Sequence, residues 1–299
     1  MAATDPSFAW GVAFASTQAE GAAEASDWRD WERQGRAPYS GDGNGYATNH
    51  RADLRLFADA GFTDARLCPE WARIEPENGR VDPWAVEHYQ QVLAAAVDAG
   101  LRPWIALADR SLPGWFALDE RGFRDHRARS YFWPRHVERS AELFGAWAHV
   151  WVPIVAPVRL ARSGYLTGTA PPGRGGAANH FLDTLAGLHL GLGEAWRVLR
   201  GSAPVAAAFD VGEVRAGDGE PTTRARTRRV EELYWAWTGA LRDGQLTLPE
   251  RGPIAAPALA DACDLIGLVI GDRLSVPEDG DWQPQPMPED VGGLVRRAA

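Results

Sequence analysis

The chain has 299 residues, of which 45% are hydrophobic and 24% are charged, the composition and length of a globular protein with a full hydrophobic core. All 31 basic residues are arginine, and the absence of lysine excludes a Schiff-base lysine and a phosphate loop that depends on lysine. The formal net charge of −9 argues against nucleic acid as a partner and gives no reason to expect binding to an anionic membrane.

Short apolar runs alternate with amphipathic segments along the chain. Six runs are predicted to form strands: Phe8–Ser16, Phe62–Cys68, Leu101–Ala108, Val150–Val155, Pro204–Phe209 and Asp264–Ile270. The longest amphipathic segments between them are predicted to form helices: Trp84–Ala99, Val137–Ala148 and His180–Arg200. This alternation indicates βα units around a parallel sheet, and the wide strand spacing is typical of a (β/α) barrel with long loops.

We expect one α/β domain over residues 1–299, because no linker divides the chain. The Arg-rich segment Arg215–Arg229 is predicted to be a mobile surface loop, and Pro288–Arg297 a last short helix. Two distant cysteines and seven histidines without metal-binding spacing predict no metal and no cofactor. No signal peptide or membrane span is evident, so we expect a cytoplasmic protein.

Four segments in this order resemble the family 1 glycoside hydrolases, the retaining β-glucosidases with a (β/α)8 barrel. They are FAWGVAFASTQAEGA (Phe8–Ala22), ARLCPEWARIEP (Ala65–Pro76), GYLTGTAPPG (Gly164–Gly173) and DLIGL (Asp264–Leu268). The resemblance implies that Gln18 binds sugar hydroxyls and that Arg66 belongs to the active site. It also implies a ligand site at the carboxyl ends of the barrel strands.

The catalytic carboxylates of that family have no counterpart in this sequence. A retaining glycosidase needs two carboxylates about 5–5.5 Å apart. The acid/base motif W-x-T-x-N-E-P is similar to Trp151–Pro157, in which Val155 and Ala156 replace Asn and Glu. The Thr-Glu-Asn-Gly-like turn that carries the nucleophile does not occur in the 299 residues. We expect a truncated barrel of about six βα units, without ordinary β-glucosidase activity.

Two further departures change the expected ligand. Asp109-Arg110 stand where the family has a sugar-binding His-Trp pair, and Val269-Ile270 stand where it has Asn-Tyr. These replacements predict a pocket with an apolar wall, suited to a largely apolar metabolite. Decay of the site, with apolar residues filling the space of lost polar groups, is the alternative.

Asp109 is the predicted acid/base, with Arg66 and Arg110 polarising a substrate oxygen, since an apolar pocket raises a carboxyl pKa. An ion pair of Asp109 with Arg66 or Arg110 is the alternative. The predicted substrate-binding residues lie near strand ends: Gln18, Glu20, Glu70, Trp71, Val155, Ala156, Asp210, Val269 and Ile270. Structural roles are the alternatives for three of these, because Glu20 can hold the first loop, Glu70 an arginine, and Asp210 can cap the following turn.

Two functions of different classes follow. The first is a repurposed enzyme of specialised metabolism, in which the pocket folds a small molecule for cyclisation, isomerisation or rearrangement. The second is an inactive pseudoglycosidase that binds a glycoside or a partner protein. We also expect a homodimer through the open barrel edge, unless the segment Asp272–Pro288 covers the gap.

Overall fold

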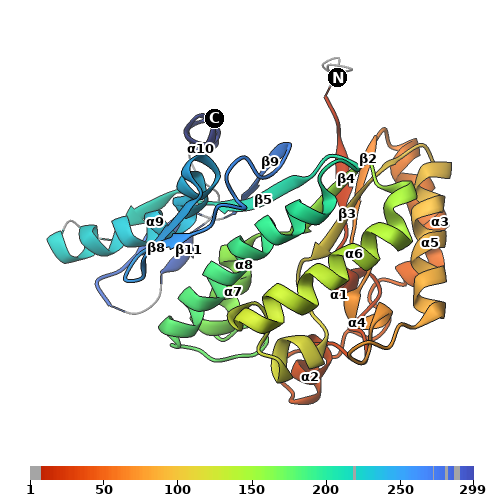
Figure 1. The fold of residues 1–299 in the computed structure, drawn as a ribbon, viewed down its shortest axis with the longest axis horizontal. Coiled ribbons are helices and arrows are strands. Elements are labelled where there is room, and N and C mark those ends of the chain that lie inside the picture. The colour runs from red at the N-terminus through yellow and green to blue at the C-terminus, as the bar shows by residue number, and fades with distance from the viewer. Residues whose placement is uncertain (1–7, 218–219, 272, 280–281, 286–289) are drawn as a thin grey trace. The chain divides into compact units, whose positions relative to one another are not determined.

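The computed structural model describes residues 8–217, 220–271, 273–279, 282–285 and 290–299. Contacts divide the chain into two compact units (Figure 1). The first unit draws its described residues from Met1–Gly122, Tyr131–Pro153 and Val198–Val205. The second draws them from Phe123–Ser130, Ile154–Arg197 and Ala206–Ala299. The single domain predicted over residues 1–299 stays a prediction.

The first unit is built on a sheet with the order β1-β2-β3-β4. These strands are β1 (Gly11–Ala13), β2 (Asp64–Leu67), β3 (Arg102–Ala108) and β4 (Val150–Ile154). β1 pairs with β2 and β2 with β3 in parallel, so that Asp64 lies opposite both Gly11 and Arg102. β3 and β4 are apolar and largely buried, as expected of parallel strands that are covered on both faces.

Helices pack beside this sheet in the first unit. They are α1 (Ser16–Ala19), α2 (Asp27–Arg33), α3 (Tyr46–Asp59), α4 (Trp71–Ile74), α5 (Pro83–Asp98) and α6 (Trp133–Phe144). Of these, α3 and α5 lie next to each other at the right of Figure 1. Short π or 3-10 turns lie at Trp115–Asp119, Gly122–Arg124, Ala128–Phe132 and Gly145–Trp147. α5 begins where the Asp82 carboxylate accepts hydrogen bonds from the N–H groups of Trp84 and Ala85, with Pro83 in the first turn.

The second unit combines a parallel strand pair with a hairpin and a small mixed sheet. β5 (Ala206–Val211) and β9 (Leu265–Ile270) pair in parallel over six residues. β7 (Gln245–Leu248) and β8 (Gly252–Ala255) form a hairpin, and β6 (Val214–Ala216), β10 (Arg273–Val276) and β11 (Gln283–Gln285) form a sheet. The helices are α7 (Pro157–Tyr165), α8 (Ala178–Leu199), α9 (Pro221–Asp243) and α10 (Val291–Ala298).

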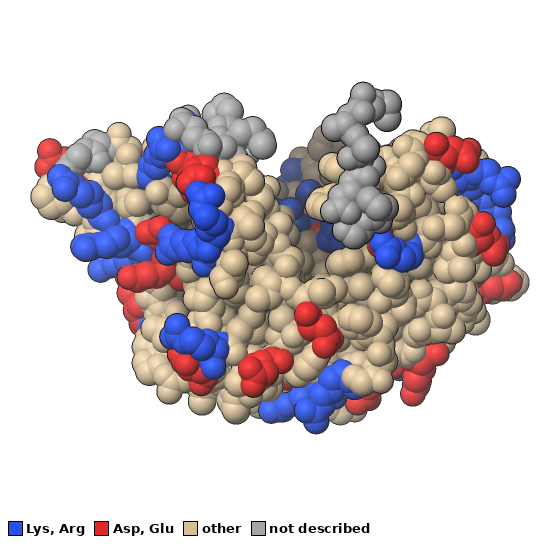
Figure 2. All heavy atoms as spheres, turned by 90° about the horizontal axis from the view of Figure 1, so that it is seen from above, with Lys and Arg blue, Asp and Glu red and all other residues tan. Residues whose placement is uncertain are grey.

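All six predicted strands are confirmed, as β1 to β5 and β9, and the three predicted helices correspond to α5, α6 and α8. The surface loop predicted over Arg215–Arg229 is wrong, because this segment contains part of β6 and the first turns of α9. The arginines in the first turns of α9 make that part of the sequence read as polar. The buried apolar residues of the helix, among them Val230, Leu233 and Trp237, come later in the chain. Figure 2 shows basic side chains gathered at the left, where Figure 1 places α9.

The C-terminal predictions lie partly outside the described residues. The last helix, predicted over Pro288–Arg297, begins at Val291, and Pro288 itself is outside. The segment Asp272–Pro288, expected to cover a gap, has both of its end residues outside.

β9 exposes apolar side chains. Leu265, Ile266 and Ile270 are 41%, 50% and 37% exposed, and the described residues pair β9 with β5 alone. The homodimer through this edge stays a prediction.

Candidate ligand site

In the first unit, the predicted catalytic residues lie on neighbouring parallel strands. Arg66 lies in β2, and Asp109 follows β3 directly. One guanidinium nitrogen of Arg66 lies 3.3 Å from Asp109 Oδ2, and Asp109 is 4% exposed. Arg110 and Gln18 are both exposed. The ion-pair alternative for Asp109 is therefore confirmed, and its role as an acid/base stays a prediction.

Glu70 follows β2 and is buried beside two hydroxyl groups. Ser16 and Ser111 both donate hydrogen bonds to Glu70 Oε2, the latter at 2.9 Å. Burial raises the pKa of Glu70 above its usual range. The charge of Arg73, in the short helix that follows, opposes this rise, so the expected hold of Glu70 on an arginine stays a prediction. Arg73 donates its hydrogen bonds to the backbone around Glu20.

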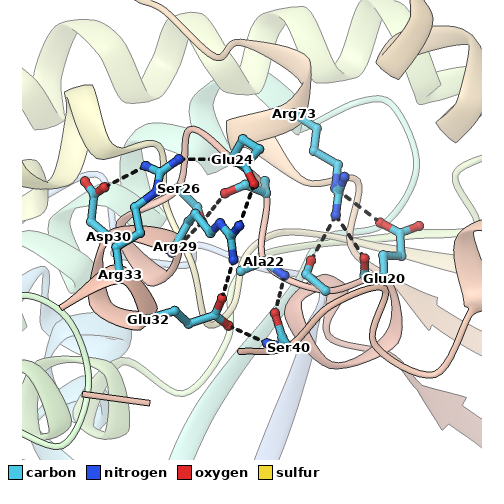
Figure 3. Close-up of polar contacts among 12 residues, drawn as sticks. Glu20, Ala22, Glu24, Ser26, Arg29, Asp30, Glu32, Arg33, Ser40 and Arg73 are labelled. Atoms are coloured by element: carbon cyan, nitrogen blue, oxygen red, sulfur yellow. Dashed lines mark hydrogen bonds and ion pairs between the residues drawn. The ribbon is translucent and has the colours of Figure 1, made fainter. Parts of the chain in front are cut away.

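Glu20 ties the first loop to two helices. Its Oε2 accepts a hydrogen bond from the Tyr89 hydroxyl at 2.6 Å, and its Oε1 lies 3.2 Å from His88 Nε2. Arg73 donates to the carbonyl oxygens of Glu20 and Gly21 at 3.1 and 2.9 Å and lies 3.7 Å from the Glu20 carboxylate (Figure 3). The structural alternative for Glu20 is confirmed.

The charged side chains of α2 pair with one another and with Glu24, which precedes the helix (Figure 3). Arg29 lies 2.9 Å from Glu24 and 3.0 Å from Glu32. Arg33 lies 2.6 Å from Glu24 and 3.1 Å from Asp30. These charged side chains therefore stabilise the segment around α2 through ion pairs within it.

Asp27, the first residue of α2, is a buried carboxyl that the sequence did not single out. Its Oδ1 accepts a hydrogen bond from the Leu112 N–H at 3.0 Å. Burial raises the pKa of Asp27 to about 7, and the nearby charge of Glu70 adds to the rise.

Trp71 lies in the aromatic core of the first unit. It is 1% exposed, and its ring stacks on His136 with 4.0 Å between the ring centroids. Its indole N–H donates to Glu75 Oε2 at 3.0 Å. This burial leaves no surface of Trp71 for a ligand.

In the second unit, Val155 and Ala156 form the bend between β4 and α7. Val155 bridges to Ala208 of β5, whose carbonyl also accepts a hydrogen bond from the Ala156 N–H at 2.9 Å. Both residues are buried, at 2% and 0% exposure. Ala156 has φ 55° and ψ 65°, a left-handed conformation that costs a residue with a Cβ atom roughly 1–2 kcal/mol. The surrounding contacts hold the backbone in this bend.

Asp210 of β5 supplies the cap that Ala156 cannot give to α7. Its Oδ2 accepts hydrogen bonds from the N–H groups of Val158 and Arg159, at 2.8 and 3.4 Å. Asp210 therefore acts as a cap, as the structural alternative expected. It caps α7, which precedes it in the chain, and not the turn that follows it. Burial raises the pKa of Asp210 to about 6, while the charge of Arg159 and these hydrogen bonds oppose the rise.

Asp210 lines a pocket of about 590 Å³ that lies wholly in the second unit. Polar side chains on one part of the wall are Arg159, Arg162, Ser163, Thr167 and Thr169. The apolar part includes Val211, Val269, Leu274 and Trp282. Of the predicted substrate-binding residues, Asp210 and Val269 therefore share one pocket, whereas Ile270 is not among its lining residues.

The polar residues of α7 were missed by the sequence reasoning. Arg159, Arg162 and Ser163 follow the acid/base-like motif at helical spacing, three and four residues apart. That spacing sets them on one face of a helix, a signal that was available in the sequence. The motif that carries the resemblance ends at Pro157, two residues before Arg159.

The described residues contain no group of three or more His, Cys, Asp or Glu side chains placed to hold a metal ion. Over the same residues, no helix has both the length and the apolar character to cross a membrane.

The sequence model of Glycosyl hydrolase family 1 matches residues 3–238, more than half of the chain. The chain belongs to this family. Among its relatives, Beta-glucosidase A from Thermotoga maritima is 28% identical over 176 residues, which cover 56% of this chain and 39% of that protein. The curated family relatives that the chain matches are thus much longer than the matched region.

Solved glycosidase structures share the fold. A beta-glycosidase from Pyrococcus horikoshii aligns with a TM-score of 0.79 at 21% identity, covering 90% of this chain and 62% of its own. A family 1 β-glucosidase from Thermotoga maritima gives the same score at 20% identity, covering 97% of this chain and 72% of its own. The fold is therefore α/β and corresponds to part of a family 1 (β/α) barrel.

Proposed function

We propose that this chain is a family 1 protein that does not hydrolyse glycosides, and that it binds an organic carboxylate and transfers a proton within it. The observation that carries the proposal is the pocket of the second unit. There one buried carboxyl, Asp210, shares the wall with Arg159 and Arg162. Its pKa of about 6 suits a group that both takes and returns a proton near neutral pH.

The absence of a second carboxylate in this pocket favours proton transfer over hydrolysis. Asp210 is the single acidic residue among the described lining residues. Double displacement at a sugar needs both an acid/base and a nucleophile. Ala156 stands where the resemblance places the acid/base, and an alanine neither gives nor takes a proton.

The proposed step is an isomerisation with no net change in oxidation state. The Asp210 carboxylate takes a proton from the carbon next to a substrate carbonyl, and the electron pair of that C–H bond forms an enolate. A guanidinium stabilises the negative charge on the enolate oxygen. The Asp210 carboxyl then returns the proton to another carbon, or to the same carbon in an exchange reaction. The second guanidinium holds the substrate carboxylate.

Exchange of hydrogen for deuterium tests this proposal. We expect the protein to speed the exchange of the C3 hydrogens of 2-oxobutanoate in D2O, followed by proton NMR. Asp210→Asn keeps a capping side chain for α7 and should lower the protein-dependent rate about 100-fold or more. Asp183→Asn is the matched control, because Asp183 is an exposed carboxylate of α8 in the same unit.

Two outcomes would overturn the proposal. One is an exchange rate that Asp210→Asn leaves unchanged. The other is hydrolysis of a nitrophenyl β-glucoside by the unaltered protein. The alternative of a pseudoglycosidase gains support if glucosides raise the melting temperature while 2-oxobutanoate neither exchanges nor binds.

A further inference from the structure

A second, mostly apolar cavity of about 470 Å³ lies beside the pocket of Asp210 in the second unit. Its wall includes Leu166, Phe181, Leu182, Val230, Leu233 and Trp282. Leu166 lies in the turn after α7, and α8 and α9 supply the other four residues apart from Trp282. Each cavity has the volume of an ordinary small-molecule site.

The two cavities share a wall. Trp282 lines both of them. Leu166 lines the apolar cavity and its neighbour Thr167 lines the polar one. In α9, Leu233 lines the apolar cavity and Tyr234 lines the polar one. Three segments that are distant in the sequence therefore each contribute to both cavities, which places the cavities side by side.

Contacts from both sides hold Trp282 in place. Arg162 donates a hydrogen bond to the Trp282 carbonyl oxygen at 2.8 Å, and its guanidinium lies 5.0 Å from the indole ring centroid. From the apolar side, the Phe181 ring meets Trp282 edge-on at 6.4 Å. Trp282 is thus the partition between a polar and an apolar compartment.

The lining side chains of the two cavities differ, and the polar groups gather in the cavity of Asp210. At the rim of the apolar cavity, Arg229 lies 3.3 Å from Glu250, which offsets its charge. Arg226 at the same rim donates hydrogen bonds to the carbonyl oxygens of Pro277 and Glu278. The polar cavity is lined by Arg159, Arg162 and three hydroxyl side chains, and Asp210 is the acidic residue among its described lining residues.

We propose that the paired cavities bind a carboxylate with a long hydrocarbon tail, the carboxylate among Arg159, Arg162 and the hydroxyls, and the tail past Trp282 in the apolar cavity. The inference rests on the proposed function in placing the reacting end of the molecule beside Asp210, and it adds the class of substrate. It accounts for an apolar cavity in which a small polar substrate would have no contact.

Binding of a chain-length series tests the inference separately from the reaction. Calorimetry should give a dissociation constant for dodecanoate on the order of 100-fold below that for butanoate, as expected when several methylene groups leave water. Arg159→Gln should weaken dodecanoate binding about 10-fold and leave the binding of neutral dodecanol unchanged. Arg242→Gln is the matched control, since Arg242 is exposed near the end of α9 and pairs with Asp243.

A tail-cavity variant sharpens the test. Leu233→Gln should remove most of the preference for dodecanoate and keep the affinity for butanoate, which also reports that the protein is folded. Bromine at the end of the chain should quench part of the tryptophan fluorescence, and Trp282→Phe should remove that part while dodecanoate still binds.

Equal affinities for dodecanoate and butanoate would overturn the inference, as would a preference that Leu233→Gln leaves intact. Deuterium exchange without a chain-length preference overturns this inference alone. A chain-length preference without Asp210-dependent exchange overturns the proposed function alone and leaves a binding site for long-chain carboxylates.

Discussion

The ends of the parallel strands in the two units use their polar side chains differently. In the first unit, Asp109 pairs with Arg66 and Glu20 bonds to Tyr89. In the second unit, the carboxyl of Asp210 caps α7 and also lines a large pocket with two arginines. The difference teaches that a polar residue at a strand end marks a candidate site where a large cavity accompanies it, whereas the pocket beside Glu20 measures only about 20 Å³. The polar residues of the first unit hold its loops together.

The largest effect is expected from the core of the first unit. Trp71→Ala should lower the free energy of unfolding by about 3–5 kcal/mol, because it opens a cavity in the aromatic core. Chemical denaturation measures the change. Trp84→Ala is the control, since Trp84 is 79% exposed and its loss should cost less than about 0.5 kcal/mol. Equal effects would mean that Trp71 has no special place in the core.

Asp27 should make the stability of the first unit depend on pH. Its pKa is about 7 in the folded protein and 3.8 without the fold, so the folded state holds more protons between these values. Stability from this group is therefore present at pH 4 and lost as the pH rises toward 7. Asp27→Asn should be more stable than the unaltered protein at pH 7, by a few kcal/mol at most, and the gain should shrink toward pH 4.

Urea unfolding at several pH values measures this trend. Asp30→Asn is the control on the same helix, because the Asp30 side chain is 43% exposed. A gain for Asp27→Asn that does not change with pH would contradict the assignment.

Asp109 provides the direct comparison with Asp210. If Asp109 only pairs with Arg66, Asp109→Asn should change the rate of deuterium exchange less than about twofold, whereas a general base contributes about 100-fold or more. Proton NMR in D2O measures both variants under the same conditions. A large fall in the rate of deuterium exchange in Asp109→Asn would identify Asp109 as the acid/base, as predicted from the sequence.

Restoring a glutamate at Ala156 is expected to have no effect on glycoside hydrolysis. Ala156→Glu should not give measurable release of nitrophenol from an aryl β-glucoside, because a proton donor without a nucleophile does not complete double displacement. Ala156→Gln is the control of similar size. Activity of the glutamate variant above that of the glutamine variant would show that a nucleophile is present in this chain after all.

Much of the fold could be predicted from the sequence, because apolar runs such as Leu101–Ala108 have the length and composition of buried parallel strands. The start of α9 could not be predicted, because residues 224–229 include four arginines and give no apolar periodicity. Most buried residues of this helix come after Arg229. The ion pair of Arg66 and Asp109, which the sequence offered as the alternative to an acid/base role, follows from their places at the ends of neighbouring strands.

Partners that come from distant segments could not be predicted in the same way. Ser111 reaches Glu70 from a different loop, and Trp282 joins two cavities from a segment more than a hundred residues beyond α7. Such contacts depend on tertiary packing, which periodicity does not encode. The placement of Arg159 and Arg162 on one face of α7, by contrast, could be predicted from their spacing alone.

The apolar edge of β9 has a consequence for assembly. If two copies join there about a two-fold axis perpendicular to the strands and the sheet, their β9 strands run antiparallel, unlike the parallel pair of β5 and β9 within each copy. Such an isologous joint uses both β9 edges and leaves neither for a third copy. Association through β9 would then stop at a dimer, whereas pairing of β9 with a different strand would continue into a ring or a filament.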